Sequence, residues 1–349
     1  MSRRTATLVV SGVLVVLLSA AAAVLPVPYV VLQPGPTTNT LGTSDGKPLI
    51  RIEGRRTYPA SGHLDLTTVA VFGGPGDSVD LFTALRGWLD ETVAVVPEET
   101  VFPPGKSAHE VEKETEAQMS ESQEYATAAA FDELGVAVGH HVEVGSVLAD
   151  SPADGQLRAG DEVVAVDGTP IRTPEAVREG VGNREPGDDV RLTIRRDGDR
   201  RTLTLATEPS PEDEERPVVG FVPREGHDFP FEVTIDLEKV GGPSAGLMFA
   251  VGIVEKLTPG NLTNGQYVAG TGTIDDDGRV GPIGGIQQKV AAAEDVGAHV
   301  FLTPAGNCAD AAAVNHDGVR LVRVETLGDA LDALDALKTG RGNVPTCAE

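Results

Sequence analysis

Two residues that together can hydrolyse acyl bonds stand in favourable local sequences, a serine among glycines and a lysine among apolar residues. Ser244 lies in Gly242-Pro-Ser-Ala-Gly246, whose glycines let another backbone approach the hydroxyl closely. Lys289 has apolar neighbours at i−3, i+1 and i+4, so helical spacing places it in a buried stripe. Burial disfavours the ammonium form and lowers the pKa from ~10.4 toward roughly 7–8, where the neutral amine acts as a base.

Each of these two residues also fits a second interpretation. A lysine at the edge of an apolar stripe can extend its ammonium to water and stay charged. The serine pentapeptide also fits G-x-S-x-G, the nucleophile elbow of an α/β-hydrolase esterase, whose triad would use Asp275–Asp277 with His299 or His316. That elbow needs a strand running directly into the serine, whereas residues 237–242 separate Ser244 from the preceding predicted strand.

We expect neither a metal site nor a bound cofactor. The seven histidines show no ligand-like spacing, and the two cysteines are wrongly spaced for zinc. Gly105-Lys106-Ser107 ends like a phosphate-binding loop, but Thr100 stands where the first glycine is required. Pro103 and Pro104 also prevent a glycine-rich nest, so we expect no ATPase motor.

The elements that must position Ser244 and Lys289 are predicted to form an α+β domain over residues 226–340. Strand-like and helix-like segments alternate along this part of the chain. The predicted strands are 231–236, 266–274, 300–303 and 319–324, and the predicted helices are 244–257, 285–296, 307–314 and 327–338.

Residues 48–134 are expected to belong to the same domain. Strands at 49–52 and 64–72 would complete its sheet. A helix is predicted to begin at the capping box of residues 107–110 and to end before Gly135. The chain between this helix and the later domain would then be an insertion.

That intervening chain, residues 135–208, is predicted to be a β-rich module. Its segment 151–171, Ser-Pro-Ala-Asp-Gly-Gln-Leu-Arg-Ala-Gly-Asp-Glu-Val-Val-Ala-Val-Asp-Gly-Thr-Pro-Ile, resembles PDZ domains of the bacterial protease-associated type. The resemblance implies a groove between a strand and a short helix that takes an extended peptide by β-augmentation, and we expect Val142, Val144 and Val177 to line it. The loop expected to hold a peptide carboxylate, near residues 134–143, departs from the Gly-Leu-Gly-Phe pattern of the family.

Three motifs occur in one order, and they are Gly242-Pro-Ser-Ala-Gly246, Gly270-Thr-Gly-Thr-Ile274 and Gly278-Arg-Val-Gly-Pro-Ile-Gly-Gly-Ile-Gln-Gln-Lys289. Over about residues 231–337 the chain resembles the proteolytic domain of the Lon family. With the PDZ-like module and an apolar N-terminus, the whole chain resembles the membrane-anchored, PDZ-containing Lon-type proteases of bacteria, in which the ATPase domain is absent.

The Lon resemblance implies a Ser–Lys dyad, in which neutral Lys289 accepts the proton of Ser244 and Thr271 orients the lysine amine. Backbone groups beside the serine would hold the oxyanion, at Gly242, Pro243, Ala245 and Gly246. The chain would then be a serine endopeptidase that cleaves unfolded or extended proteins without ATP. Lon-type domains often form rings, so a homo-oligomer is also implied.

Two positions depart from the Lon pattern. Gly241 stands where an acidic residue is usual, three residues before the serine, and Thr273 stands where glutamate is usual. A non-catalytic, membrane-anchored PDZ adaptor with an inactive protease fold therefore remains an alternative.

The N-terminus is predicted to anchor the chain in the cell membrane. Residues 1–5, with Arg3 and Arg4, would form a cytoplasmic tip before the uncharged stretch 6–25, which is long enough to cross a hydrocarbon core of ~30 Å. Residues 26–47 would form a stalk, and everything after them, including the catalytic domain, would be extracytoplasmic. A cleaved signal peptide is the alternative, and it would export the same residues.

The composition limits the partners and the compartment. The formal net charge of −25 disfavours binding to nucleic acid. The acidic, proline-containing residues 209–225 are predicted to be a linker. Outside the cell, Cys308 and Cys347 would form a disulfide that ties the tail, residues 341–349, to the last domain, although two separate thiols are the alternative.

Overall fold

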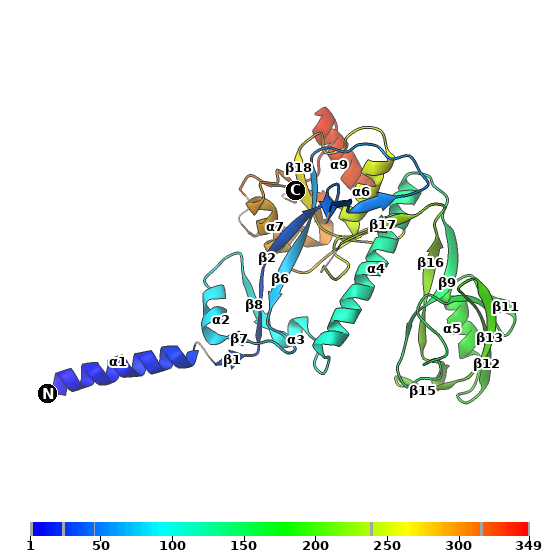
Figure 1. Ribbon diagram of the computed structural model, residues 1–349, viewed down its shortest axis with the longest axis horizontal. Helices are drawn as coiled ribbons and strands as arrows, with labels where there is room; N and C mark the ends of the chain where they lie inside the picture. The colour runs from blue at the N-terminus through cyan, green and yellow to red at the C-terminus, as the bar shows by residue number, and fades with distance from the viewer. Residues whose placement is uncertain (1–2, 23–24, 45, 238–239, 315–316, 348–349) are drawn as a thin grey trace. The chain divides into compact units, whose positions relative to one another are not determined.

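The computed structural model describes residues 3–22, 25–44, 46–237, 240–314 and 317–347. Two compact units make up the chain (Figure 1). One, here called the split unit, comprises residues 1–136 and 231–349, and the other, the inserted unit, comprises Ala137–Pro230. The inserted unit therefore interrupts the sequence of the split unit.

The split unit is built on a six-stranded sheet whose strands come from distant parts of the sequence. Its strand order is β22-β21-β18-β6-β2-β8. The first four strands run parallel to one another, and β2 and β8 are antiparallel to their neighbours. The bounds are β22 Arg320–Val324, β21 Val300–Pro304, β18 Tyr267–Gly270, β6 His63–Phe72, β2 Tyr29–Asn39 and β8 Ala94–Pro97. In Figure 1 the early strand β6 lies beside the late strand β18, and β2 follows on the other side of β6.

Two of the expected early strands have different roles. The strand predicted at 64–72 corresponds to β6, which joins the six-stranded sheet. The strand predicted at 49–52 corresponds to β5 (Ile50–Ile52), which pairs instead with β17 (Val233–Ile235) in a separate two-stranded sheet. Chain from both sides of the inserted unit is thus needed to build the split unit.

Four helices pack around these strands. They are α4 (Ala108–Glu133), α6 (Gly246–Leu257), α7 (Ile286–Asp295) and α9 (Leu327–Thr339). Helix α6 is buried from Gly246 to Glu255 and packs against α4 and α9, whereas α7 packs on β2 and β6. The capping box predicted for α4 is confirmed, because the Ser107 side chain accepts from the Glu110 N–H and the Glu110 carboxylate accepts from the Ser107 N–H.

The stalk expected at 26–47 is wrong, because β2 occupies half of it. Val30 and Val31 are wholly buried, and β2 pairs with both β6 and β8. The prolines and glycine that suggested a stalk lie instead at a bulge, where the register of β2 against β6 shifts between Pro34 and Thr37. A bulge and an exposed stalk favour the same residue types, so composition alone did not separate them.

The expected membrane anchor over residues 6–25 is not supported. A helix, α1, runs from Arg3 to Ala22. Across the ranges that the structure describes, no helix meets the length and apolarity needed to cross a membrane. Of the cytoplasmic tip expected at 1–5, residues 1 and 2 lie outside the described residues.

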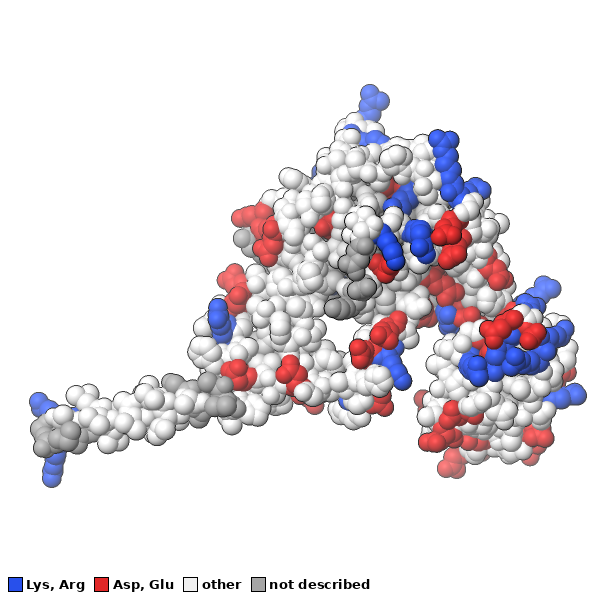
Figure 2. Space-filling view, in the orientation of Figure 1, with Lys and Arg blue, Asp and Glu red and all other residues white. Residues whose placement is uncertain are grey.

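The inserted unit contains a sheet in the order β13-β12-β10-β9-β16, one helix, α5 (Pro174–Gly182), and the short strand β11 (Thr169–Pro170), which pairs with β10. The strand bounds are β9 Gly139–Val147, β10 Glu162–Val166, β12 Asp189–Arg196, β13 Asp199–Ala206 and β16 Phe221–Asp228. Figure 2 shows acidic and basic side chains interspersed over the visible face of the molecule, with no wide uniformly basic area on that face.

The linker expected at 209–225 is also wrong. A strand, β15 (Asp213–Val218), and the first half of β16 occupy it, and β16 pairs with β9 along its whole length. Val219, between these two strands, is buried in the core of the inserted unit. The charges that suggested a linker lie on the first four residues of β15, 213–216, which are all exposed, and the strand becomes buried only at Pro217.

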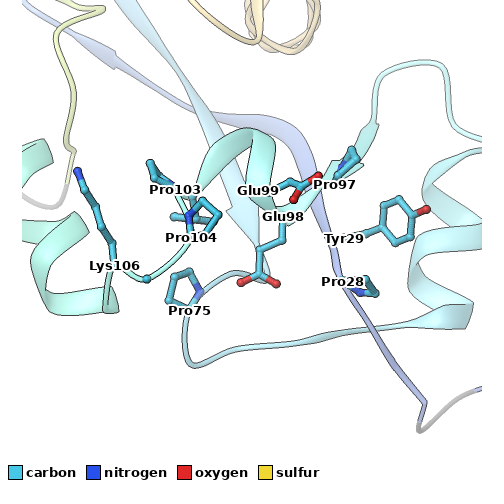
Figure 3. A pocket seen from close by; sticks show the side chains of 11 residues that line it. Pro28, Tyr29, Pro75, Pro97, Glu98, Glu99, Pro103, Pro104 and Lys106 are labelled. Atoms are coloured by element: carbon cyan, nitrogen blue, oxygen red, sulfur yellow. The ribbon is translucent and has the colours of Figure 1, made fainter.

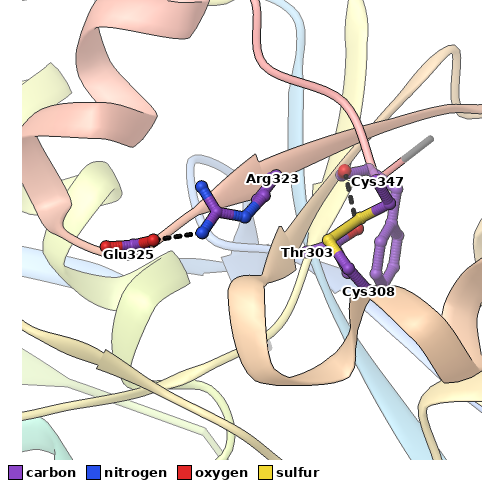
Figure 4. The surroundings of a disulfide bond; sticks show 6 residues. Thr303, Cys308, Arg323, Glu325 and Cys347 are labelled. Atoms are coloured by element: carbon purple, nitrogen blue, oxygen red, sulfur yellow. Dashed lines mark hydrogen bonds and ion pairs between the residues drawn. A yellow bond between two sulfur atoms is a disulfide. The ribbon is translucent and has the colours of Figure 1, made fainter. Parts of the chain in front are cut away.

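The C-terminal tail is fastened at two points. Cys308, at the start of α8 (Cys308–Ala312), forms a disulfide with Cys347 (Figure 4). Thr346 also forms a β-bridge with Val322 of β22. The tail expected at 341–349 therefore packs against the split unit over its described part.

Candidate active site

Ser244 lies just before α6, beside a cavity of about 480 Å³. Its side chain is half-buried. The cavity is lined by the loop that precedes α6, by residues 66–70 of β6 and by Lys289. Strand β17 ends at Ile235, so among the described residues no strand runs directly into the serine as a nucleophile elbow requires.

Lys289 is only 3% exposed, and its amine reaches the serine. Its Nζ atom lies 2.7 Å from Ser244 Oγ and 2.9 Å from Thr271 Oγ1. Burial lowers the pKa of Lys289 to about 8, because the ammonium loses its hydration there. The structure therefore brings together the serine and the lysine that the sequence singled out, in an environment that favours the uncharged amine.

Thr271 links the lysine to the backbone of the serine. The residue is wholly buried, and its Oγ1 donates a hydrogen bond to the Ser244 carbonyl oxygen at 2.9 Å. Because a hydroxyl has one hydrogen, Thr271 accepts, rather than donates, in its contact with Lys289. One N–H of a neutral amine is held in this way, which leaves its lone pair free to face the Ser244 hydroxyl.

The tight approach of α7 to β6 depends on Gly285. Its φ is +66°, and a Cβ added there would lie 2.7 Å from Val69 Cγ2. Helix α7 begins at the next residue, Ile286, and carries Lys289 one turn later. The glycine thus fixes how closely the lysine helix meets the strand beside the cavity.

Only some of the backbone groups expected to hold an oxyanion are available. Pro243 has no N–H, and the Gly242 N–H donates to the carbonyl of Thr115 at 3.0 Å. The Gly246 N–H points to the Pro243 carbonyl at 3.4 Å. Within the described ranges nothing accepts a hydrogen bond from the N–H of Ser244 or Ala245, so these two donors are the ones free to meet a substrate.

Strand β6 offers an unpaired edge beside the serine. Its partner β18 pairs with it only as far as Leu66. From Thr67 to Ala70, β6 continues along the cavity, and none of the described strands pairs with it on the β18 side. Such an edge can bind an extended chain through main-chain hydrogen bonds.

The histidines do not assemble an esterase triad. His299 is exposed at the start of β21, and His316 lies outside the described residues. None of the described histidines lines the cavity beside Ser244. Arg279 forms ion pairs with Asp275 and Asp277, so these acids have another partner.

A second cavity, of about 470 Å³, lies elsewhere in the split unit and is lined largely by prolines (Figure 3). Lys106, whose motif resembles the end of a phosphate-binding loop, borders it and forms an ion pair with Glu114. Glu98 and Glu99 also line it. No serine, threonine or cysteine is among the residues that line this cavity.

Only one of the three valines expected to line the groove of the inserted unit borders it. Val142 and Val144 are 1% and 0% exposed and form part of the core rather than a groove. Val177, also 1% exposed, borders a groove of about 230 Å³ between α5 and residues 216–223. The strand beside this groove is β16, at the edge of the sheet, not β9, which is paired on both sides.

Sequence reasoning placed that groove wrongly because it assumed that the groove strand comes first in the module. The run Val219-Gly220-Phe221-Val222 immediately precedes and begins β16. Its glycine between apolar residues resembles the Gly-Leu-Gly-Phe pattern that was sought near Val142. This run was the available signal, and it lay within the stretch interpreted as a linker.

Two family models match parts of the chain. Residues 113–207 match the PDZ domain, and residues 238–336 match the Lon protease (S16) C-terminal proteolytic domain. The first match begins inside α4, although the inserted unit begins at Ala137. Neither match reaches half of the 349 residues.

Individual relatives divide in the same way. The chain is 36% identical over 107 residues to Lon protease 2 of Bacillus subtilis, which is 31% of this chain and 18% of that protein. It is 40% identical over 79 residues to the magnetosome formation protease MamE of Paramagnetospirillum magneticum, or 22% of this chain and 11% of that protein. The chain thus spans less than a fifth of the length of these two relatives.

Among solved structures, the PDZ domain of the SdrC-like protein of Listeria innocua aligns at 22% identity with a TM-score of 0.23. It covers 24% of this chain and 93% of that one. A protein of Geobacillus thermodenitrificans solved in solution aligns at 39% identity and a TM-score of 0.22, over 23% of this chain and 92% of that one. By the two family models, one part of the chain is similar to the PDZ domain and another to the Lon C-terminal proteolytic domain, and the two relatives named above are proteases.

Proposed function

We propose that this protein is an ATP-independent serine endopeptidase with a Ser244–Lys289 dyad. The observation that carries the proposal is the 2.7 Å contact between Lys289 Nζ and Ser244 Oγ, at a lysine whose pKa burial lowers to about 8. A base of that pKa is deprotonated in a useful fraction of molecules near neutral pH. The match of residues 238–336 to the Lon proteolytic domain supports the same chemistry.

In the proposed acylation step, Ser244 Oγ attacks the carbonyl carbon of a peptide bond while Lys289 Nζ takes the hydroxyl proton. The N–H groups of Ser244 and Ala245 stabilise the oxyanion. When the C–N bond breaks, the Lys289 ammonium returns the proton to the leaving amine. Thr271 holds the amine throughout, through the 2.9 Å contact with Nζ.

Deacylation repeats these roles with water. The neutral amine of Lys289 takes a proton from a water molecule, whose oxygen attacks the acyl carbon of the Ser244 ester. When the second tetrahedral species breaks down, the bond from the acyl carbon to Ser244 Oγ breaks, and the Lys289 ammonium returns its proton to Oγ, which releases the carboxylic acid and restores the serine hydroxyl. No metal or organic cofactor takes part in this proposal.

The proposed substrates are unfolded or extended proteins. The open edge of β6 from Thr67 to Ala70 supports binding of an extended chain beside Ser244. The groove between α5 and β16 supports binding of a second extended segment, which the PDZ domain would present. A folded substrate has no free extended segment that could bind at the β6 edge or in this groove.

The proposal includes an extracytoplasmic location. The disulfide between Cys308 and Cys347 supports it, because such bonds persist in oxidising compartments. Alkylation of free thiols before and after reduction, in protein taken directly from cells, tests the location. Two thiols that react only after reduction agree with it, and two thiols that react at once contradict it.

A phosphonylating probe tests the dyad in the full-length protein. We expect a fluorophosphonate to label Ser244, and Lys289→Ala to slow labelling by about 10²–10⁴-fold, as loss of a general base does. Lys256→Ala is the matched control, since burial also lowers the pKa of Lys256 but this residue lies on α6 outside the cavity. Its labelling rate should stay within about twofold of the wild type.

The same experiment separates the alternatives. Absence of label in the wild type at every pH between 6 and 10 would favour a non-catalytic PDZ adaptor. Loss of label in His299→Ala but not in Lys289→Ala would favour an esterase. The 2.7 Å dyad contact makes both outcomes unexpected.

A further inference from the structure

Helix α4 touches the loop before the proposed nucleophile at two points, although it lies outside the segment that matches the Lon proteolytic domain. The Gly242 N–H donates to the Thr115 carbonyl at 3.0 Å. The Ser122 hydroxyl donates to the Pro243 carbonyl at 2.9 Å. Thr115 and Ser122 are two helical turns apart, so they lie on one face of α4.

The bond from Ser122 is unlike the usual bond of a hydroxyl inside a helix. A buried serine or threonine in a helix commonly donates to a carbonyl of its own preceding turn. Thr127 of α4 does so, with its Oγ1 donating to the Gln123 carbonyl at 2.8 Å. Ser122 is 3% exposed, yet it donates across to the loop.

This bond fixes the direction of one oxyanion donor. The Pro243 carbonyl and the Ser244 N–H belong to one planar trans peptide unit, so they point in opposite directions. Holding the carbonyl against α4 therefore turns the Ser244 N–H away from α4. On that other side no described residue accepts a bond from it, which leaves it for a substrate.

Two glycines show how closely α4 approaches the chain on either side of Ser244. A Cβ added to Gly241 would lie 2.8 Å from Thr115 Cβ, and one added to Gly246 would lie 2.9 Å from Ser122 Oγ. Neither position can hold a larger residue unless the helix or the loop moves. An acidic side chain at position 241, which is usual in the Lon pattern, would therefore meet Thr115.

The opposite side of the serine is held by a different segment. The Ser244 carbonyl accepts hydrogen bonds from Thr271 Oγ1 and from the Gly272 N–H, both at 2.9 Å. The peptide unit before Ser244 is thus held by Ser122 of α4, with a longer contact of 3.4 Å from the Gly246 N–H, and the peptide unit after it is held by residues 271–272. The two supports are independent of each other.

We propose that Ser122 and Thr115 of α4 are positioning residues that set the oxyanion-binding backbone of Ser244. The inference rests on the proposed peptidase function and extends its machinery beyond the segment 238–336. Ser122 acts through its hydroxyl and Thr115 through its main-chain carbonyl. Neither residue touches the substrate or the transferred proton.

Ser122→Ala in the full-length protein tests the role. Without the bond, the Pro243–Ser244 peptide can rotate, and we expect kcat for an unstructured peptide to fall by about 10- to 100-fold, less than for outright loss of an oxyanion donor. KM should change by less than about twofold and the pH midpoint should not move, since the β6 edge and the burial of Lys289 are untouched.

Two control variants identify a merely structural effect. Thr127→Val removes a buried hydroxyl from the same helix, and Ser120→Ala makes the same substitution at an exposed site of α4. Both should keep kcat within about twofold of the wild type. A fall in kcat for Thr127→Val as large as that for Ser122→Ala would overturn the proposal, as would an unchanged kcat in Ser122→Ala.

Amide hydrogen exchange measures the same contact without any substrate. In Ser122→Ala, the peptide covering residues 240–247 should exchange faster by about tenfold, because local opening becomes easier. Unchanged exchange would overturn the positioning role. If the wild type hydrolyses nothing but exchange still rises in the variant, then the contact stands and the peptidase function is what fails.

Discussion

The pKa of Lys289 is lowered by burial alone. Among the residues that the structure describes, no acid or cation contributes to the shift, and the amine contacts the hydroxyls of Ser244 and Thr271. The fall from 10.5 to about 8 corresponds to about 3 kcal/mol of differential stability between the two protonation states. The reactivity of the site thus depends on keeping water away from one side chain.

The pH dependence of turnover follows from this pKa. Because the neutral amine is the base, kcat/KM should rise about tenfold per pH unit below pH 8 and level off above it, with a midpoint near the pKa of about 8. The measurement is a profile of peptide hydrolysis from pH 5.5 to about 9.5. A flat profile, or a rate that falls as the pH rises through 8, is incompatible with Lys289 as the base.

The hydroxyl of Thr271 can be tested without changing its shape. Thr271→Val removes the acceptor for the lysine N–H and the donor to the Ser244 carbonyl, so we expect kcat to fall by about 10- to 100-fold. Thr271→Ser restores the hydroxyl and should recover most of the rate. Equal values of kcat in Thr271→Val and the wild type would mean that Thr271 is not needed to orient the Lys289 amine.

At the scale of elements, two helices hold the site, α4 from the chain before the inserted unit and α7 from the chain after it. Helix α7 carries the lysine against β6, and α4 carries the contacts to the loop before Ser244. Both approaches are close enough to require glycine, at Gly285 and at Gly241. A shift of α7 relative to β6 would therefore displace Lys289, and a shift of α4 relative to the loop at Gly241 would displace the backbone of Ser244.

Gly241 should not tolerate the side chain that the Lon pattern suggests. In Gly241→Ala the new Cβ would lie 2.8 Å from Thr115 Cβ, so we expect a loss of about 1–3 kcal/mol in the free energy of unfolding and a lower kcat. Gly328→Ala on α9 is the control, because its Cβ would meet its nearest neighbour at an ordinary 3.7 Å. Denaturant unfolding and peptide hydrolysis measure the two effects, and a Gly241→Ala protein as stable and active as Gly328→Ala would refute the close contact.

The sequence predicted the elements with strong local signals and missed those that depend on distant partners. The capping box of α4 and the apolar stripe around Lys289 are local, and both are present. Strand β2 carries a proline-rich bulge and pairs with β6 and β8, so nothing nearby in the chain identifies it as a strand. The strand β16 was obscured in the same way, by the charges of β15 just before it.

The same distinction holds within the site. Ser244, Lys289 and Thr271 stand in motifs, so the sequence named them. Ser122 stands in a long acidic helix with no motif, and its role depends on a loop that follows it by more than a hundred residues. A hydroxyl on the apolar face of α4, in register with buried positions, was the one local signal.

At the scale of the whole molecule, the inserted unit divides the sequence of the other unit. Its first and last strands are paired, with Gly139 opposite Asp228, so the chain leaves and re-enters at neighbouring positions. The split unit, in contrast, needs β2, β6 and α4 from before the insertion as well as Ser244 and Lys289 from after it. The two halves of the protease fold are therefore not separate domains.

Removing the inserted unit should leave the proposed peptidase folded. A chain in which a short Gly-Ser turn replaces residues 139–228 keeps all strands of the six-stranded sheet, because the junction residues already lie opposite each other. We expect its kcat/KM for a short unstructured peptide to stay within about threefold of the full chain. A chain that begins at Phe231 should instead be insoluble, since it lacks half of the sheet. Good solubility of that fragment, or collapse of the shortened chain, would contradict this division.

The interrupted order of the split unit also sets when the proposed dyad can form during synthesis of the chain. Helix α4 leaves the ribosome before the inserted unit, and Ser244 and Lys289 follow after it. At ~5–20 residues per second, the PDZ domain occupies the ribosome for roughly 5–20 s between these two events. A nascent chain that stalls in that interval has neither nucleophile nor base, so an unfinished copy cannot cleave the polypeptides around it.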